Sequence, residues 1–170
     1  DLLFRIQEQY QRRKGKSIYY KDVIQYFHHP FVQGILTKEE LSAIGKLESM
    51  IVANNRLFLS VEELGLSDRL KLLNSAVFEP WKNNWSDAME LVHRLNTGLD
   101  ELLPEKNLLE KAVLRSFDHA LIGLTNVMNE ADVPEMQLGT FKNLFNQHWS
   151  GESMSYFGNP MEGLQIMGLL

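Results

Sequence analysis

The stretch KNLLEKAVLRSFDHALIGLTNVMNE, residues 106–130, decides the fold class. Apolar side chains recur in it every three or four residues, which is the spacing of one face of an α-helix. We therefore predict a long amphipathic helix here, and a core on the side that the apolar stripe faces. The stripe consists of Leu109, Val113, Phe117, Leu121, Leu124 and Met128.

Segments on both sides carry the same spacing and are bounded by residues that begin or end helices. Thr37 with Glu40, and Ser60 with Glu63, have the spacing of a capping box. Ser86 is expected to cap a further helix, and prolines interrupt the pattern. The sequence predicts a mainly α, multi-helix domain. Its expected helices cover 2–13, 22–27, Thr37 to Asn54–Asn55, Ser60 to Gly65, Ser67 to Phe78, 87–103, 106–130 and 138–149.

The last residues differ in character from the rest of the chain. Two short apolar runs, Met154–Phe157 and Leu164–Met167, flank the turn residues Gly158 to Gly163. This pattern is typical of two short strands around a turn. We expect a helical domain at 1–153 and a C-terminal strand pair within 154–170, in a segment of a longer protein.

Composition excludes several classes of protein. The chain has 170 residues, of which 44% are hydrophobic and 23% charged, the composition of an ordinary globular domain. It contains no Cys, which rules out a disulfide framework and thiolate metal ligands, and which fits the reducing cytoplasm. No stretch approaches the roughly 20 apolar residues of a membrane span.

Charge is unevenly spread along the chain. The net charge is −5, yet residues 1–37 hold six bases and three acids. The basic residues Arg12, Arg13, Lys14 and Lys16 form a short patch that could contact the phosphates of a nucleic acid. Cations at the end of a helix also suit the helix dipole, so a solvated helix end explains the same pattern.

No motif for catalysis, cofactor binding or metal binding stands out. Gly15-Lys16-Ser17 resembles the end of a phosphate-binding loop, but Tyr10 occupies the position of the first glycine. His28 and His29 are adjacent and would point apart on a helix, and His93, His119 and His148 are isolated. The tryptophans are expected in the core. We therefore expect no catalytic residue, cofactor or metal.

The end of the chain resembles a known family. Residues 157–168, FGNPMEGLQIMG, are similar to a passage in the bacterial AddB-like proteins of Bacteroidetes. These are inactivated superfamily I helicases with a PD-(D/E)XK nuclease domain. In them, a strand of the type Leu-Gln-Ile-Met-Gly leads into the region of helicase motif V. Tyr19–Val23, followed by His28-His29-Pro30-Phe31, resembles an earlier passage in the same family.

The resemblance implies that the chain is the helical insertion of a RecA-like lobe, with residues 154–170 returning to that lobe. It further implies a non-catalytic role in DNA double-strand break repair. The expected partners are DNA, a helicase–nuclease partner subunit and the neighbouring RecA-like lobe, with no membrane. A free-standing helical module that binds another protein is the alternative.

Overall fold

The computed structural model describes residues 1–13, 17–64 and 67–151, and within them it contains eight α-helices and one two-stranded sheet. The mainly α, multi-helix prediction is confirmed. The predicted C-terminal strand pair, and the segment 154–170 as a whole, lie outside the described residues. The elements are α1 (Leu2–Arg12), β1 (Ile18–Tyr19), α2 (Tyr20–Phe27), α3 (Pro30–Ile35), α4 (Lys38–Ala53), β2 (Phe58–Leu59), 3-10 turns at Glu62–Leu64 and Asp68–Leu70, α5 (Lys71–Phe78), α6 (Trp85–Leu102), α7 (Leu108–Glu130) and α8 (Leu138–Gly151).

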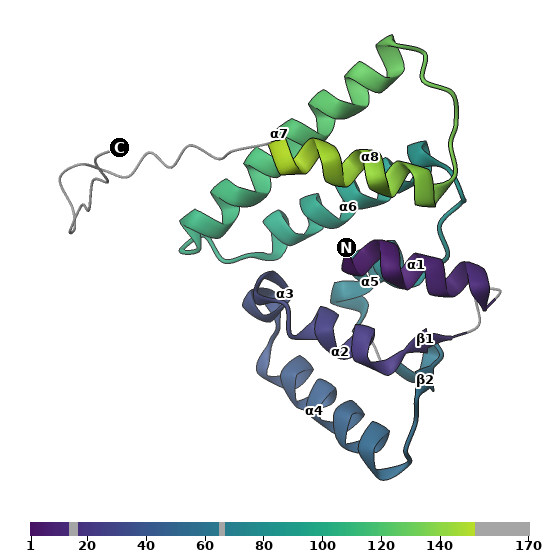
Figure 1. Cartoon of the computed structure of the whole chain (residues 1–170). Helices are drawn as coiled ribbons and strands as arrows, with labels where there is room; N and C mark the ends of the chain where they lie inside the picture. Colours follow the sequence, from purple (N-terminus) through teal and green to yellow (C-terminus); the bar gives the residue numbers. More distant parts are fainter. Residues whose placement is uncertain (14–16, 65–66, 152–170) are drawn as a thin grey trace, which may run out of the picture.

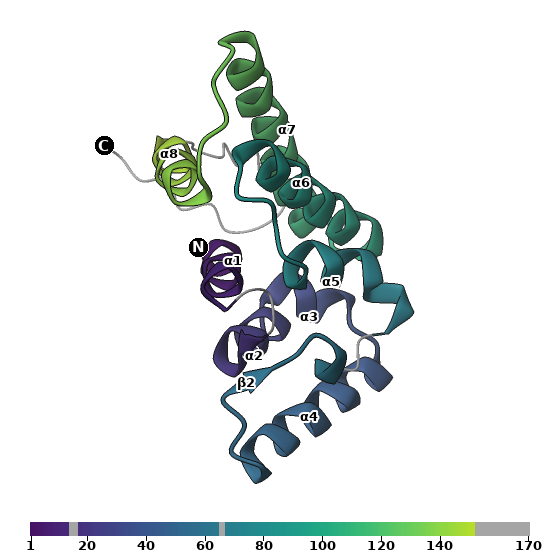
Figure 2. The ribbon, with the colours of Figure 1, turned by 90° about the vertical axis from the view of Figure 1, so that its right-hand side faces the viewer.

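Two apolar cores hold these helices together. The first lies among α1 to α5 and also takes in Leu99 of α6 and Leu114 of α7, and the second lies among α6, α7 and α8 (Figure 1). Helix α1 contributes to both, because Phe4 packs in the second core while Ile6 and Tyr10 pack in the first. Both views place α1 and α5 between α6–α8 on one side and α2–α4 on the other (Figure 2). The domain is thus built on an interior pair of helices that touch both halves.

Gln7 joins α1 to the segment between the two cores by hydrogen bonds. It is only 1% exposed, its Nε2 donates to the carbonyl oxygens of Val77 and Glu79 at 3.0 Å each, and its Oε1 accepts from the Trp81 backbone N–H at 2.9 Å. These backbone groups belong to the end of α5 and to the connection towards α6. A single buried amide therefore fixes α1 against the connection between the two cores.

The strand pair in the described residues was not predicted from the sequence. β1 pairs antiparallel with β2, with Ile18 opposite Leu59 and Tyr19 opposite Phe58. Ile18 and Leu59 are fully buried in the first core, whereas Tyr19 and Phe58 are partly exposed. The pairing brings two aromatic rings from distant parts of the sequence to one surface.

The capping box that begins α4 is confirmed. The Thr37 hydroxyl accepts the Glu40 backbone N–H at 3.2 Å, and the Glu40 carboxylate accepts the Thr37 backbone N–H at 2.8 Å. The helix ends as expected, at Ala53, with Asn54 following and Asn55 at a φ of 49°. Asparagine tolerates this left-handed conformation better than most residues do.

The second expected capping box is only half formed. The Glu63 carboxylate accepts the Ser60 backbone N–H at 2.8 Å, but the segment that follows is a 3-10 turn, Glu62–Leu64. Ser67 precedes another 3-10 turn without capping it, because its hydroxyl donates to Glu40 instead. The predicted helix from Ser67 to Phe78 is therefore a 3-10 turn followed by the shorter α5.

Two helix starts differ from the prediction. Helix α6 begins at Trp85, and its cap is Asn84, whose side-chain oxygen accepts the Asp87 backbone N–H at 3.1 Å. Ser86 lies inside the first turn and donates to Glu135. Helix α2 ends before Pro30, as expected, but Pro30 then begins the unpredicted α3 as its first residue, a position that proline favours.

The predicted stripe of α7 is right in its second half and wrong at its start. Leu121, Leu124 and Met128 are buried in the second core, as expected. Leu109 is 57% exposed, and Lys111 and Leu114 are buried in that part of the helix. At the start of α7 the buried face is therefore the one that carries Lys111 and Leu114, and not the one that carries Leu109.

Candidate nucleic-acid interface

The basic patch predicted from the sequence begins at the end of α1. Arg12 is the last residue of this helix and Arg13 is the residue that follows it, and both side chains are exposed. Lys14 and Lys16 lie outside the described residues. Both interpretations of Arg12 fit this position, because it lies in the last turn of the helix as well as on the surface.

Arg12 and Arg13 line an open groove of about 540 Å³ together with Gln9, Tyr19 and Phe58. The Arg13 guanidinium carbon lies 3.4 Å from the centre of the Phe58 ring, which is a cation–π contact. The Phe58 and Tyr19 ring centres are 5.6 Å apart. The groove thus combines two cations with two partly exposed aromatic rings.

Local hydrogen bonds hold the groove in place. Gln9 accepts the Tyr19 backbone N–H at 3.0 Å through its side-chain oxygen, and its amide donates to Asp22 at 2.5 Å. Asp22 also pairs with Arg5 at 2.7 Å, and it is 3% exposed. The end of α1 is therefore fixed to β1 and to the start of α2, so the positions of the aromatic rings relative to Arg12 are set by the fold.

The two arginines of the groove differ from the others in charge balance. Among the described residues, neither Arg12 nor Arg13 forms an ion pair with an acidic side chain. Every other arginine has one: Arg5 with Asp22, Arg56 with Glu63, Arg69 with Glu40, Arg94 with Glu90 and Arg115 with Asp100. The charge of Arg12 and Arg13 is consequently left for solvent or for a ligand.

Sequence reasoning did not find Phe58 or Tyr19 as parts of this site. They lie about forty residues apart in the chain, and only the pairing of β1 with β2 brings them together. No local pattern predicts such a pairing. The basic run, in contrast, was visible because its members are neighbours in the sequence.

Two ionisable groups outside the lining of the groove, Tyr10 and Glu62, have shifted pKa values. Burial, with smaller contributions from Glu62 and Glu79, raises the pKa of Tyr10, whose hydroxyl donates to the Phe78 carbonyl. The hydrogen bond from the Ser60 hydroxyl lowers the pKa of Glu62. Tyr10 therefore stays neutral and Glu62 stays anionic around neutral pH.

The adjacent histidines His28 and His29 do not share a site. His28 Nε2 lies 2.6 Å from a Glu48 oxygen, while the His29 ring stacks on Phe31 with 5.7 Å between the ring centres. Burial lowers the pKa of His29. The two histidines have different partners, as expected, but they lie between α2 and α3 and not within one helix.

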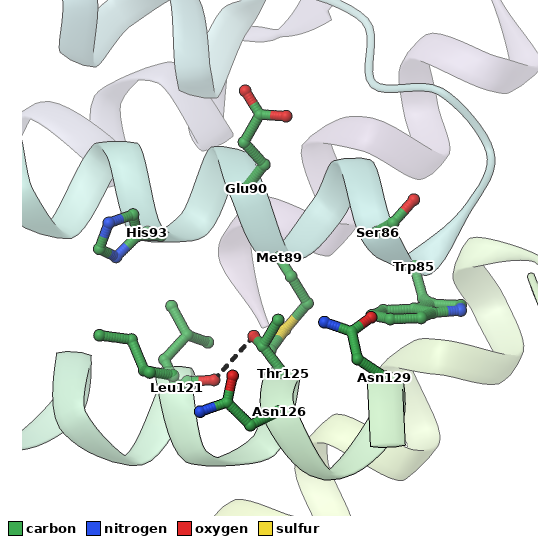
Figure 3. Close-up of a pocket in the computed structure, with 10 residues that line it drawn as sticks. Trp85, Ser86, Met89, Glu90, His93, Leu121, Thr125, Asn126 and Asn129 are labelled. Carbon is green, nitrogen blue, oxygen red and sulfur yellow. Dashed lines mark hydrogen bonds between the residues drawn. The ribbon is translucent and has the colours of Figure 1, made fainter. Parts of the chain in front are cut away.

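A second groove, of about 280 Å³, lies between α6 and α7 (Figure 3). Met89 from α6 points toward α7 in this groove, and the ring of Trp85 lies beside Asn129 of α7 (Figure 3). The Thr125 hydroxyl at the edge of the groove donates to the Leu121 carbonyl at 2.9 Å. The hydroxyl is thereby held within its own helix.

His93 at the end of this groove bonds to α7 rather than to a neighbour in sequence. Its Nδ1 lies 2.6 Å from Asp118 Oδ1, and Asn96 donates to the same oxygen at 3.3 Å and to the Leu114 carbonyl at 2.9 Å. The partner of Asp118 thus comes from the other helix and not from its neighbour in sequence, His119. These bonds tie α6 to α7.

Residues 1–13, 17–64 and 67–151 contain no group of three or more His, Cys, Asp or Glu that could hold a metal ion. None of the helices in those ranges has the length and apolarity needed to cross a membrane.

Comparison with protein-family models, with curated proteins and with solved structures finds no match for this chain.

Proposed function

We propose that this chain is a non-catalytic helical domain that contacts nucleic acid through the groove between α1 and the strand pair. The observation that carries the proposal is the missing acidic partner of Arg12 and Arg13 among the described residues, beside the rings of Tyr19 and Phe58. Arginine side chains of this kind neutralise phosphates, and aromatic rings stack on bases.

We further propose that the domain belongs to an AddB-like helicase–nuclease subunit that acts in DNA double-strand break repair in the cytoplasm. The sequence resemblance at residues 157–168 supports this assignment, and a mainly α architecture is what a helical insertion of a RecA-like lobe requires. In this proposal the partners are DNA, a partner subunit and the neighbouring RecA-like lobe. The domain itself contributes no catalytic, cofactor or metal residue.

Binding of a fluorescently labelled oligonucleotide tests the nucleic-acid contact. The full chain is titrated onto single-stranded and duplex DNA at about 50 mM salt, where phosphate contacts are strong. We expect the Arg12→Ala/Arg13→Ala double variant to lose about tenfold in affinity. Arg94→Ala is the control, because Arg94 is an exposed arginine that Glu90 already pairs. Equal binding by all three proteins, or no binding by the unmodified chain, would contradict the proposal.

A free-standing protein-interaction module remains the alternative function, and one observation favours it. Helix α7 exposes Leu109 by 57% and Val127 by 62%, and exposed apolar side chains of this kind are available for contact with another protein. The gene sequence beyond Leu170 separates the two proposals. A Glu-Thr-Arg continuation with a nuclease motif downstream supports the helicase–nuclease assignment, and a stop codon supports the module.

A further inference from the structure

A third groove lies between α7 and the last turn of α8. It has a volume of about 720 Å³ and is lined on α7 by residues from Arg115 to Val127, and on α8 by His148. Ala120, Gly123 and Val127 give it a floor of small and apolar groups. A Cβ built on Gly123 meets nothing within 4 Å, so the floor of the groove is open.

Polar side chains at the rim of the groove include no carboxylate. The lining includes Arg115, His119 and His148 and no acidic residue. Arg115 is 66% exposed at its side chain while it pairs with Asp100 at 3.3 Å. A segment that fits this groove should therefore be apolar and free of basic residues.

We propose that Met154–Phe157, the first apolar run after α8, packs in this groove. The run follows Gly151, the last residue of α8, after two residues, and Trp149 in the last turn of α8 already stacks on Phe117 of α7 with 4.5 Å between the ring centres. An extended chain spans about 3.3 Å per residue, so Tyr156, five residues beyond Gly151, can lie up to about 16 Å from the end of α8.

Composition and charge both match this occupant. Residues 152–170 contain two acids, Glu152 and Glu162, and no Lys, Arg or His. The tether raises the effective concentration of the run at the groove to about the millimolar range, so modest contacts are enough to hold it there. Tyr156 and Phe157 supply large apolar surface, and Val127 offers its exposed side chain to them. This inference does not rest on the proposed nucleic-acid contact.

Disulfide trapping in the full chain tests the proposal, because the sequence has no native Cys. Gly123→Cys is combined with Ser155→Cys, which leaves Tyr156 and Phe157 in place. The control combines Ser155→Cys with Gly45→Cys, since a Cβ at Gly45 on α4 also meets nothing within 4 Å. We expect the intramolecular disulfide to form at least about tenfold more readily in the first pair, in a glutathione buffer.

A second pair of variants separates packing from mere proximity to the end of α8. Tyr156→Ser and Phe157→Ser are added to the Gly123→Cys/Ser155→Cys chain. Its intramolecular disulfide should then form no more readily than the disulfide of the Gly45→Cys/Ser155→Cys control. An unchanged advantage over the control would mean that the tether alone brings the two cysteines together, which would overturn the proposal. Disulfide-linked dimers in place of the intramolecular bond would overturn it as well, because a second copy would then fill the groove.

Discussion

Arg69 holds the carboxylate of Glu40 through two nitrogens. Its Nε lies 3.2 Å from Oε1 and its Nη2 lies 2.5 Å from Oε2, while the same Nη2 donates to the Ile35 carbonyl. Glu40 also accepts from the Ser67 hydroxyl and from the Thr37 backbone N–H. One side chain thereby caps α4 and ties it to the segment before α5.

This arrangement predicts a pH-dependent stability. Burial alone would raise the pKa of Glu40, but the hydrogen bonds from Arg69, Ser67 and Thr37 outweigh it and hold the pKa at about 2. The folded pKa is thus below the unfolded value of about 4.3. The stabilisation is fully present above the unfolded pKa and is lost as the pH falls through the folded pKa.

Glu40→Gln should therefore destabilise the domain by up to about 3 kcal/mol at pH 7 and by progressively less below pH 4. Urea unfolding at a series of pH values measures the difference between the two proteins. Glu39→Gln on the same turn, at an exposed position, is the matched control and should change the urea midpoint little. A difference between Glu40→Gln and the unmodified chain that stays constant from pH 7 to pH 3 would show that the carboxylate charge is not involved.

Leu121→Ala should cost about 2–5 kcal/mol of unfolding free energy, since truncating a fully buried leucine leaves a cavity. Leu121 is 1% exposed in the middle of α7. Leu109→Ala on the same helix should cost little, because Leu109 is 57% exposed. Urea midpoints that fall equally for both variants would contradict the burial pattern of α7.

Gln7→Leu should destabilise the domain although it replaces an amide with an apolar group of similar size. The change leaves the Trp81 backbone N–H and the carbonyls of Val77 and Glu79 without their buried partner, at about 1–3 kcal/mol for each group left unsatisfied. Thermal melting of Gln7→Leu beside Gln11→Ala measures this, because Gln11 is an exposed residue one turn further along α1. A melting temperature equal to that of the unmodified chain would mean that the two cores do not depend on this amide.

Asn84→Ala should cost about 0.5–2 kcal/mol, and Ser86→Ala should cost less, because the Asn84 side chain caps α6. Asn and Ser are both common helix caps, so residue type alone does not decide between Asn84 and Ser86, and the sequence-based choice of Ser86 was wrong. Chemical unfolding of the two variants compares them directly. If Ser86→Ala lowered the unfolding free energy more than Asn84→Ala did, Ser86 and not Asn84 would be the residue that caps α6.

The parts of the fold that were predicted depend on local interactions. The α4 capping box spans four residues, Thr37–Glu40, and the helix forms where the pattern indicates. The strand pair joins Tyr19 to Phe58, and the cation–π contact joins Arg13 to the same ring, so both depend on the tertiary fold. The error at Leu109 has the same origin, since the way α6 packs decides which side of α7 is covered.

In the candidate site, too, the local feature could be predicted from the sequence and the tertiary feature could not. Arg12 and Arg13 were found because a basic run is visible in the sequence. Their lack of an acidic partner among the described residues could not be seen there, because it depends on where the acids of other elements lie.

The salt dependence of DNA binding tests the central claim most directly. The logarithm of the binding constant is measured against the logarithm of the salt concentration, for the unmodified chain and for Arg12→Ala/Arg13→Ala. If both arginines contact phosphates, the slope should become shallower by about 1 to 2 in the double variant, since each phosphate contact contributes about 0.7–0.9. Parallel lines for the two proteins, or a slope near zero for the unmodified chain, would contradict the claim that this groove binds nucleic acid.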